Sequence, residues 1–407
     1  MTIMKHIRRT CLPSLAMIGF VLTLAAQTQA ADFQDLSTFL GPRDAMVVSG
    51  PDGSILFSHH EDLPLVPAST LKILTALVAF QYLGEDYRFK TEFYLDDQSN
   101  LKIKGYGDPL LTSEVIAEVC TSLFDLLKDT APALSSVIVD PSYYDNDVAI
   151  PGITDSTEPY DAPNGALCVN FNTVNFRKAY GRYISAEPQT PLLPVVLDRI
   201  KKAGLSKGRI TLSHERDELV LYAGHLFKHF LEKAGFKVLE RVRIGQIDST
   251  DIRVLEHHSP FSLKQVVAKM MTYSNNFMAN QILLQSGVSQ TGPPGNLKKG
   301  VDAITSYAKN ILHMQSVEIS EGSGISRKNH LTALDLHRSV RAFKPYHKLL
   351  RQDGNEFYKT GTLKNISTRA GFVGTDPDSQ VAYVILCNTP GRSARPLRDR
   401  LLDALQK

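Results

Sequence analysis

The sequence predicts a mixed α/β (α+β) fold in which helices flank an antiparallel sheet and a smaller α/β region is inserted into the chain. Strand-like segments joined by tight turns occur near both ends, and an almost wholly apolar helix follows the first of them. The middle of the chain differs, with short strands and many turns. We therefore expect one discontinuous domain built from residues 31–85 and 257–407, interrupted by one or two small modules over 86–256.

Residues 1–30 have the pattern of a secretory signal peptide. Three basic residues among the first nine precede an apolar run over 12–26, and small residues near Ala30 form a cleavage site. The run is too short and too interrupted for a comfortable membrane span. The sequence therefore predicts export to the periplasm, with no stable membrane anchor after cleavage.

Charge and cysteine content argue against several classes of function. Without the signal peptide the chain has 42 basic and 42 acidic residues, a balance that argues against nucleic-acid binding. Three cysteines remain, Cys120, Cys168 and Cys387, so at most one disulfide can form, and whether Cys120 pairs with Cys168 stays open. No Cys-x-x-Cys or His-Glu-x-x-His pattern occurs, so we expect no metal and no cofactor.

The first elements come before the insert. Residues 33–40 predict a short helix, and residues 44–60 predict two strands around a Pro-Asp-Gly turn. A helix follows from about Pro67 to Leu83, with Pro67 in its first turn and Gly84 as its stop. Its residues are apolar nearly all round, which predicts a central, buried helix.

Later elements follow from the same patterns. In the insert, SSVIVDPSYYD and YDAPNGALCVNFNTVNF predict strands, and AGHLFKHFLEKAGFKV predicts a helix that ends at Gly235 and leads into a strand. After the insert the chain turns helical, then ends in three strands, FYKTGTL, STRAGFVGT and QVAYVILCN, and a final helix. Leu397, Leu401 and Leu405 share one face of that helix, which is more typical of a core-facing helix than of a membrane anchor.

The apolar helix contains an unusual pair, Ser69 and Lys72, within VPASTLKILTAL. Residues three apart share one face of a helix, so the two side chains should lie side by side. Burying an ammonium group is costly, because the charge loses its hydration. One use for such a lysine is to take the proton of the serine hydroxyl and so make a nucleophile.

Two other Ser-x-x-Lys pairs provide a comparison. Ser99 and Lys102 lie in a predicted hairpin, whereas Ser306 and Lys309 lie on an ordinary amphipathic helix where the lysine is expected to be solvated. Only the pair at Ser69 lies in an apolar setting just after a proline. Ser69 is therefore the candidate nucleophile.

Two further motifs follow in order along the chain. Ser274 and Asn276 form the only Ser-x-Asn, and residues 359–362 contain the only Lys-Thr-Gly. Ser-x-x-Lys, Ser-x-Asn and Lys-Thr-Gly in this order form the active-site set of the penicillin-recognising serine enzymes. The three together are a far stronger signal than any one alone.

The chemistry fits the positions of the first two motifs. Ser69 can attack a carbonyl and form an acyl-enzyme, while Lys72 takes its proton if nearby positive charge keeps the ammonium partly deprotonated. Ser274 can relay a proton to the leaving amine. Asn276 can hold the substrate amide and Lys72.

The third motif suits a negatively charged substrate. Lys359, Thr360 and Thr362 offer a cation and two hydroxyls to a substrate carboxylate, and Gly361 lets the strand lie close to the substrate. The backbone N–H groups of Ser69 and Thr362 are candidates for an oxyanion hole.

Longer segments extend the likeness beyond the motifs. The chain resembles the D-alanyl-D-alanine carboxypeptidase/endopeptidase family, the low-molecular-mass class C penicillin-binding proteins, in GYGDPLLTSE, VDPSYYD, YDAPNGALCVNFN, HHSPFSLKQVVAKMMTYSNNFMANQIL, EGSGISRKNHLT and YKTGTL. The resemblance implies a penicillin-binding-protein/β-lactamase-like transpeptidase domain. It also implies a serine-type carboxypeptidase, endopeptidase or both, acting on peptidoglycan stem peptides and covalently inhibited by β-lactams.

The resemblance assigns the same roles to the motif residues. Ser69 is the nucleophile, Lys72 the base, and Ser274 and Asn276 form the second motif; the third motif is Lys359, Thr360 and Gly361. Two departures stand out. Glu321 opens EGSGIS where the family usually has Asp, and the insert is short around 175–220, so its outer subdomain is expected to be reduced or absent.

Two alternatives remain open from the residues. A serine β-lactamase shares the motifs but needs a group that activates a deacylating water, and Ser69 and Ser274 are 205 residues apart, far more than a compact lactamase would use. A catalytically inactive wall-binding protein should have a broken motif, and none is broken. The sequence does not choose between carboxypeptidase and endopeptidase.

Overall fold

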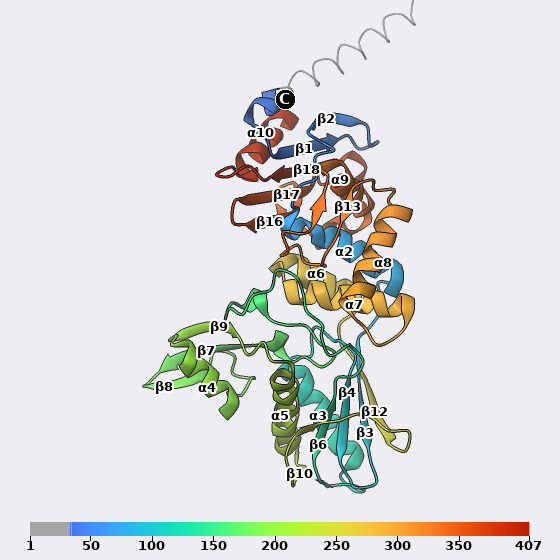
Figure 1. The fold of residues 1–407 in the computed structure, drawn as a ribbon, viewed down its shortest axis with the longest axis vertical. Coiled ribbons are helices and arrows are strands. Elements are labelled where there is room, and N and C mark those ends of the chain that lie inside the picture. Colours follow the sequence, from blue (N-terminus) through green and yellow to red (C-terminus); the bar gives the residue numbers. More distant parts are fainter. Residues whose placement is uncertain (1–32, 34, 407) are drawn as a thin grey trace, which may run out of the picture.

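The structure is a computed structural model that describes residue 33 and residues 35–406; the predicted signal peptide lies outside them. The described chain is elongated (Figure 1). A sheet with its helices forms one end, and a mixed region formed by the middle of the chain forms the other. Each end has its own large hydrophobic core.

A six-stranded antiparallel sheet joins the two ends of the chain. Its order is β15-β16-β17-β18-β1-β2, and the pairing of β1 with β18 brings the first strand against the last. The strands are β1 (Asp44–Ser49), β2 (Ile55–His59), β15 (Arg351–Asp353), β16 (Glu356–Leu363), β17 (Ile366–Val373) and β18 (Val381–Cys387).

Helices cover both faces of this sheet. Because side chains alternate along a strand, Val47 enters the core beneath one face and Val48 enters the core beneath the other. The Val47 face packs on the buried helix α2 (Lys72–Leu83) and on its neighbours α6 (Leu263–Tyr273), α7 (Asn276–Thr291), α8 (Leu297–Asn310) and α9 (Ala333–Ala342). The Val48 face packs on the 3₁₀ helix η1 (Asp35–Phe39) and on α10 (Ala394–Gln406).

Short elements complete this region. They are η2 (Ala68–Leu71), β13 (Val317–Glu318), β14 (His330–Leu331), η5 (Lys344–Leu349) and η6 (Pro377–Ser379).

The second sheet belongs to the middle of the chain. It is five-stranded, in the order β11-β6-β4-β3-β12, and mixed, because β6 pairs in parallel with both β4 and β11. The helices α3 (Ser113–Leu127) and α5 (Arg216–Ala234) share its core. Its strands are β3 (Lys90–Leu95), β4 (Leu101–Gly105), β6 (Val137–Asp140), β11 (Arg243–Ile244) and β12 (Ile252–His258), and β5 (Ala133–Leu134) pairs separately with β10 (Lys237–Val238).

A small outer module projects from this region (Figure 1). It consists of α4 (Pro194–Ala203) and a three-stranded sheet in the order β8-β7-β9, from β7 (Thr173–Ala179), β8 (Arg182–Ser185) and β9 (Lys207–Thr211). Of the two expected outcomes, a reduced or an absent outer subdomain, the structure excludes absence. The chain reaches the module through η3 (Pro159–Asp161) and η4 (Asn170–Asn172).

Most of the sequence-based elements are found, including the first strand pair, the buried helix ending at Gly84 and the three late strands. The segment YDAPNGALCVNFN is different, because its strand begins only at Thr173. The side chains of Asn170 and Asn172 bond to backbone groups of Ser113 and Pro163, which competes with regular strand pairing. The predicted domain boundaries at 85/86 and 256/257 stay a prediction.

The structure also describes the cysteines, the last helix and the hydropathy of the helices. Cys120, Cys168 and Cys387 are all free and buried, so Cys120 and Cys168 do not pair. Leu397 and Leu401 of α10 are buried against the sheet, as a core-facing helix requires. Among the described residues, no helix combines the length and the hydropathy needed to cross a membrane.

Candidate active site

Ser69 lies where a 3₁₀ turn runs into the central helix. It belongs to η2, and Lys72 is the first residue of α2, so the prediction of one continuous helix is wrong by one turn. The preceding Ala68 has φ +46, a left-handed conformation that costs an alanine about 1 kcal/mol. Thr368 of β17 donates a hydrogen bond of 2.8 Å to the carbonyl of Pro67 and so fixes this turn against the sheet.

Lys72 is fully buried and satisfied by neutral acceptors. Its Nζ lies 3.1 Å from Ser69 Oγ, 2.8 Å from Asn276 Oδ1 and 2.6 Å from the carbonyl of Ser323. No carboxylate of the described residues forms an ion pair with it. Burial therefore lowers the pKa of Lys72 to about 7, although the charge of Glu321 opposes this shift. The expected cause, nearby positive charge, is not the main one.

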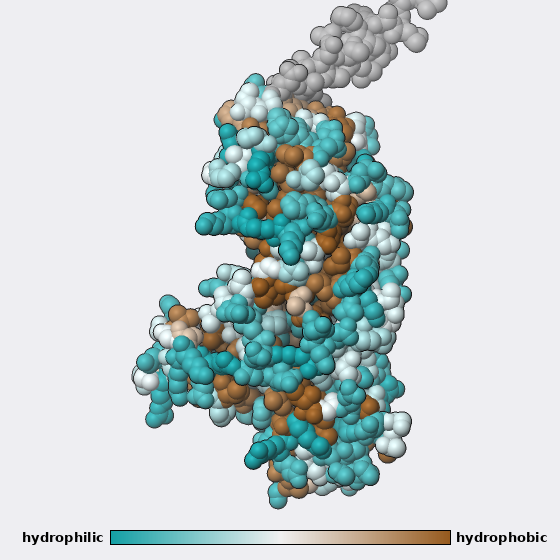
Figure 2. Space-filling view, viewed as in Figure 1, coloured by the Kyte–Doolittle hydropathy of each residue, from teal (hydrophilic) through white to brown (hydrophobic). Residues whose placement is uncertain are grey.

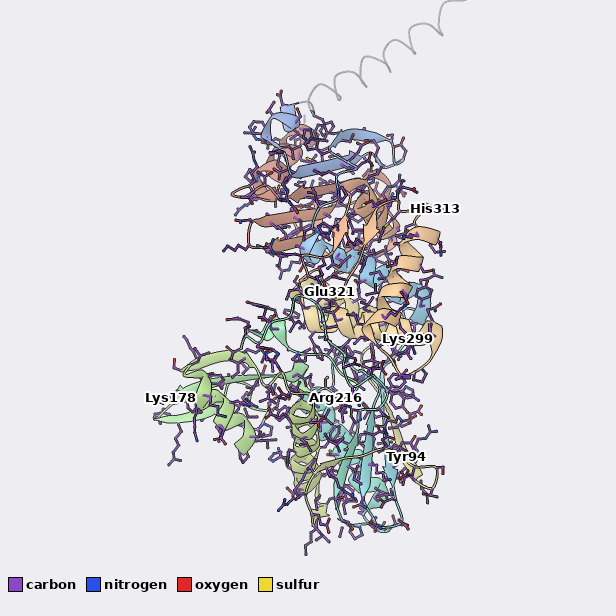
Figure 3. All side chains as sticks on the ribbon, in the orientation of Figure 1. Tyr94, Lys178, Arg216, Lys299, His313 and Glu321 are labelled. Atoms are coloured by element: carbon purple, nitrogen blue, oxygen red, sulfur yellow. The ribbon has the colours of Figure 1, made fainter. Side chains whose placement is uncertain are left out.

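The sequence does not point to the carbonyl of Ser323, although the segment EGSGIS that contains it is part of the family resemblance. Glu321 is fully buried and holds this loop, because its carboxylate accepts hydrogen bonds from the backbone and hydroxyl of Ser323 and from the backbone of Gly324. Asn280 of α7 and Asn329 also donate to it. Figure 3 places Glu321 next to the helices below the sheet. The loop thereby presents one of the three acceptors for Lys72.

The second motif lies at the junction of two helices. Ser274 ends α6 in the left-handed conformation, with φ +52, and Asn276 begins α7. Between them, Asn275 caps α7 by accepting a hydrogen bond of 2.8 Å from the backbone N–H of Met278. This junction points the side chain of Asn276 at Lys72 and that of Ser274 at Lys359.

Lys359 of β16 is the second buried lysine of the site. It is 2% exposed, and its Nζ donates to Ser274 Oγ at 2.7 Å and to the carbonyl of Thr360 at 2.7 Å. Burial lowers the pKa of Lys359 to about 6, and the charges of Lys72 and Arg351 add to the shift. The two lysines therefore compete for protons within one enclosed site.

Gly361 lets β16 lie against the nucleophile's turn. A Cβ at this position would lie 2.7 Å from the backbone nitrogen of Ser69 and 2.4 Å from Thr368 Oγ1, too close for any side chain. The close neighbour in the structure is the turn that carries Ser69, and the approach of Gly361 to a substrate stays a prediction.

The two threonines of the third motif lie on the alternate positions of β16. Thr360 is half-buried and Thr362 exposed, and no hydrogen bond of the described residues joins either hydroxyl to another motif residue. The neighbouring strand β15 pairs only with Glu356 to Tyr358. From Lys359 to Leu363, β16 therefore has one edge without a strand partner.

All three motifs thus meet at Ser69, although 290 residues separate Ser69 from Lys359. The match to a family profile agrees with this arrangement: the description is "D-Ala-D-Ala carboxypeptidase 3 (S13) family", and the matched residues are 28–195 and 205–352. The chain belongs to this S13 family. The matched residues include the first two motifs and stop before Lys359.

Two curated relatives of low sequence identity are named as carboxypeptidases. A D-alanyl-D-alanine carboxypeptidase of Actinomadura sp. is 27% identical over 334 residues, covering 71% of this chain and 62% of the relative. A carboxypeptidase of Mycobacterium tuberculosis is 25% identical over 345 residues, covering 79% of this chain and 63% of the relative. This chain therefore spans less than two thirds of the length of these relatives.

A solved structure shows that the whole fold recurs. Penicillin binding protein 4 from Haemophilus influenzae superposes with a TM-score of 0.74 at 19% sequence identity, covering 92% of this chain and 99% of that chain. The match extends over nearly the full length of both chains. The likeness therefore includes the mixed middle region as well as the six-stranded sheet.

Proposed function

We propose that this protein is a serine-type D-alanyl-D-alanine carboxypeptidase, endopeptidase or both, which cleaves peptidoglycan stem peptides through an acyl-enzyme on Ser69. One observation carries the proposal. Lys72 is fully buried without a carboxylate partner, and its Nζ lies 3.1 Å from Ser69 Oγ. Family membership and the names of the two curated relatives support the same reaction.

Acylation begins at Ser69. Neutral Lys72 accepts the hydroxyl proton as Oγ attacks the carbonyl carbon of the penultimate D-residue. Asn276 and the carbonyl of Ser323 hold the Nζ in place, so the nitrogen stays aimed at Ser69 in both protonation states. The backbone N–H groups of Ser69 and Thr362 are the proposed donors to the oxyanion of the tetrahedral intermediate.

The leaving group departs on the side of Ser274. The C–N bond breaks, and a proton reaches the leaving amine through the Ser274 hydroxyl, which Lys359 contacts at 2.7 Å. Lys359 also presents its charge to the carboxylate of the leaving residue, and Thr360 and Thr362 flank the same edge of β16. Water then hydrolyses the acyl ester and restores Ser69.

β-Lactams fit the same scheme as covalent inhibitors. They carry a carboxylate next to a reactive amide, and acylation of Ser69 opens the ring without releasing a separate leaving group. A structure of the Haemophilus penicillin binding protein 4 with a bound β-lactam, which superposes with a TM-score of 0.69, supports this part of the proposal. We place the enzyme in the periplasm, where its substrate lies, after removal of residues 1–30.

Labelling with a fluorescent penicillin tests the nucleophile. We expect a covalent, slowly released label on the purified protein, lost in Ser69→Ala and retained in Ser99→Ala and Ser306→Ala. The two control serines have the same spacing to a lysine but lie outside the site. Labelling that survives Ser69→Ala would disprove the assignment, and rapid multiple-turnover hydrolysis would instead indicate a β-lactamase.

Digestion of purified sacculi identifies the bond that is cut. Loss of terminal D-Ala from pentapeptides indicates a carboxypeptidase, and conversion of crosslinked dimers to monomers indicates an endopeptidase. If the penicillin-labelled, folded protein gives neither product, the peptidase proposal is wrong and wall binding without catalysis becomes the better explanation.

A further inference from the structure

The outer module has a charge that the rest of the chain lacks. Residues 173–211 contain eight Lys and Arg against two Asp and Glu, whereas the remaining residues contain 37 basic and 40 acidic. Figure 3 shows Lys178 at the far tip of this module. An excess of positive charge confined to one small module points to an anionic partner.

The strand register gathers much of this charge on one face of the three-stranded sheet. Arg177 of β7 is directly opposite Lys207 of β9, and Arg209 lies two residues further along β9 on the same face. Arg182 of β8 is opposite Ala179, which again shares the face of Arg177. We call these four residues the basic face: Arg177, Arg182, Lys207 and Arg209. The other face is buried, because Val174, Phe176 and Ile210 belong to the core.

Three of the four residues of the basic face are not neutralised from within the described chain. Arg209 pairs with Glu187, but no ion pair of the described residues involves Arg177, Arg182 or Lys207, and all three are exposed. Like charges directly opposite each other across two strands are destabilising. The pair Arg177/Lys207 therefore costs folding stability, and an external anion would offset that cost.

The basic face runs into a cavity beside the candidate active site. This cavity has a volume of about 760 Å³, and its lining includes Thr173 and Arg209 from the module and Tyr273 and Asn275 from either side of Ser274. Figure 2 shows the surface hollowed between the module and the sheet. Basic face and cavity thus form one path that leads toward the second motif.

The cavity offers charges of both signs to a ligand. Lys269 of α6 contacts the ring of Phe261 at 5.0 Å, and within the described chain it has no ion-pair partner. Glu114 and Glu118 are exposed on α3, also without ion pairs there. A peptide that carries carboxylates and an amine would find a counterpart for each.

We propose that the basic face and this cavity bind a second, carboxylate-bearing stem peptide of peptidoglycan while the first occupies the Ser69 site. The inference rests on the proposed function and extends it toward crosslinked wall polymer as the substrate. Arginine forks suit carboxylates, and a polymer with repeated carboxylates can occupy several positions on the face at once. Continuity with the cavity beside Ser274 favours the wall polymer over any other anion.

The test compares two double variants of equal charge. Arg177→Gln/Lys207→Gln removes two charges from the basic face, and Lys201→Gln/Lys202→Gln removes two exposed charges from α4 of the same module. We expect the first to digest purified sacculi about 3- to 30-fold more slowly at low salt, with the difference shrinking as salt is added. Cleavage of a short soluble D-Ala-D-Ala peptide and penicillin labelling should stay unchanged in both, and the α4 variant should digest sacculi normally.

Binding provides a readout that does not need catalysis. In a Ser69→Ala background, cosedimentation with sacculi should weaken with the basic-face substitutions and not with the α4 substitutions. Equal behaviour of the two double variants overturns the inference, whether both lose binding or neither does. If the basic-face substitutions abolish binding to phosphatidylglycerol vesicles but leave binding to sacculi intact, the inference is also overturned. The basic face would then bind a membrane surface. If the proposed function itself is wrong, the parent protein will not be labelled by fluorescent penicillin, and this outcome is distinct from the binding results.

Discussion

Lys72 and Lys102 share the same spacing to a serine and are both buried, yet their surroundings shift their pKa values in opposite directions. Lys102 is 6% exposed and forms ion pairs with Asp248 at 3.0 Å and Asp251 at 2.8 Å. These carboxylates raise the pKa of Lys102, although burial opposes the rise. Lys72 meets only a hydroxyl, an amide oxygen and a carbonyl, and burial lowers its pKa to about 7.

The difference shows what turns a Ser-x-x-Lys pair into a candidate catalyst. All three Ser-x-x-Lys pairs of the chain have the same spacing, and in two of them the lysine is buried. A buried lysine with a carboxylate partner is a permanently charged structural group, whereas one with neutral acceptors can lose its proton near neutral pH. Lys309 of the third pair differs from both, because it is exposed on α8 and its ammonium group is not buried.

The largest effect is expected on the acylation rate when Lys72 and Lys102 are each replaced by methionine. Lys72→Met removes the proposed base next to Ser69 and should slow acylation by a fluorescent penicillin by about 10³-fold or more. Lys102→Met, which lies in the β3–β4 hairpin, should leave the second-order acylation rate within about twofold of the parent's. Equal rates for the two variants would contradict the role of Lys72.

Lys359→Ala should have the next largest effect. Lys359 is the proposed partner of the substrate carboxylate, so loss of its charge should lower kcat/KM on D-Ala-D-Ala substrates. The expected decrease corresponds to about 2–4 kcal/mol of transition-state stabilisation. Lys364→Ala is the matched control, because Lys364 is an exposed lysine five residues along the same hairpin. A substrate amidated at its terminal carboxylate should lose most of the difference between parent and Lys359→Ala. If the amide shows the full difference, Lys359 does not act on the carboxylate.

Much of this arrangement could be predicted because it depends on short segments. The three motifs, the apolar helix and the late strands each leave a local pattern of residues, and the order of the motifs was informative without any structure. The carbonyl of Ser323 could not be predicted, since any residue has a carbonyl and its aim depends on the buried Glu321 and its partners. The cause of the pKa shift of Lys72 was also beyond the sequence, because it is burial, which depends on how the whole chain packs around the ammonium group.

Replacing Lys72 and replacing Lys102 by methionine should change the folding stability in opposite directions. The pKa of Lys72 is lower in the folded state than its ordinary value of 10.5, so between about pH 7 and 10.5 the unfolded chain binds more protons and stability rises with pH. Lys72→Met removes this penalty and should stabilise the protein by about 1–4 kcal/mol at pH 7, with the gain vanishing above pH 10.5.

The pKa of Lys102 is instead raised by its carboxylates, so its contribution to stability is present at neutral pH and is lost only above its ordinary value. Lys102→Met should therefore destabilise the protein at pH 7, by about 1.5–3 kcal/mol. Urea unfolding of both variants at pH 7 measures the two changes. A loss of stability in Lys72→Met as large as that in Lys102→Met would contradict the contrast between them.

The pH profile of acylation should show the smallest but most specific effect. The proposed reaction needs Lys72 neutral and Lys359 charged, so its active form holds one proton on the pair. Burial lowers the pKa of Lys72 to about 7 and that of Lys359 to about 6, and the charge of Lys72 adds to the lowering at Lys359. We expect kcat/KM to follow a bell-shaped curve with its maximum near pH 6–7, falling about tenfold per pH unit well outside it.

Lys359→Arg separates the two limbs of that curve. A guanidinium stays charged over the whole range, so the falling limb should disappear while the rising limb, set by Lys72, remains. The rate itself will be lower, because an arginine cannot reproduce the short contact with Ser274 Oγ. The shape is therefore the measurement: a falling limb retained in Lys359→Arg would assign that ionisation to another group and break the link between the two buried lysines.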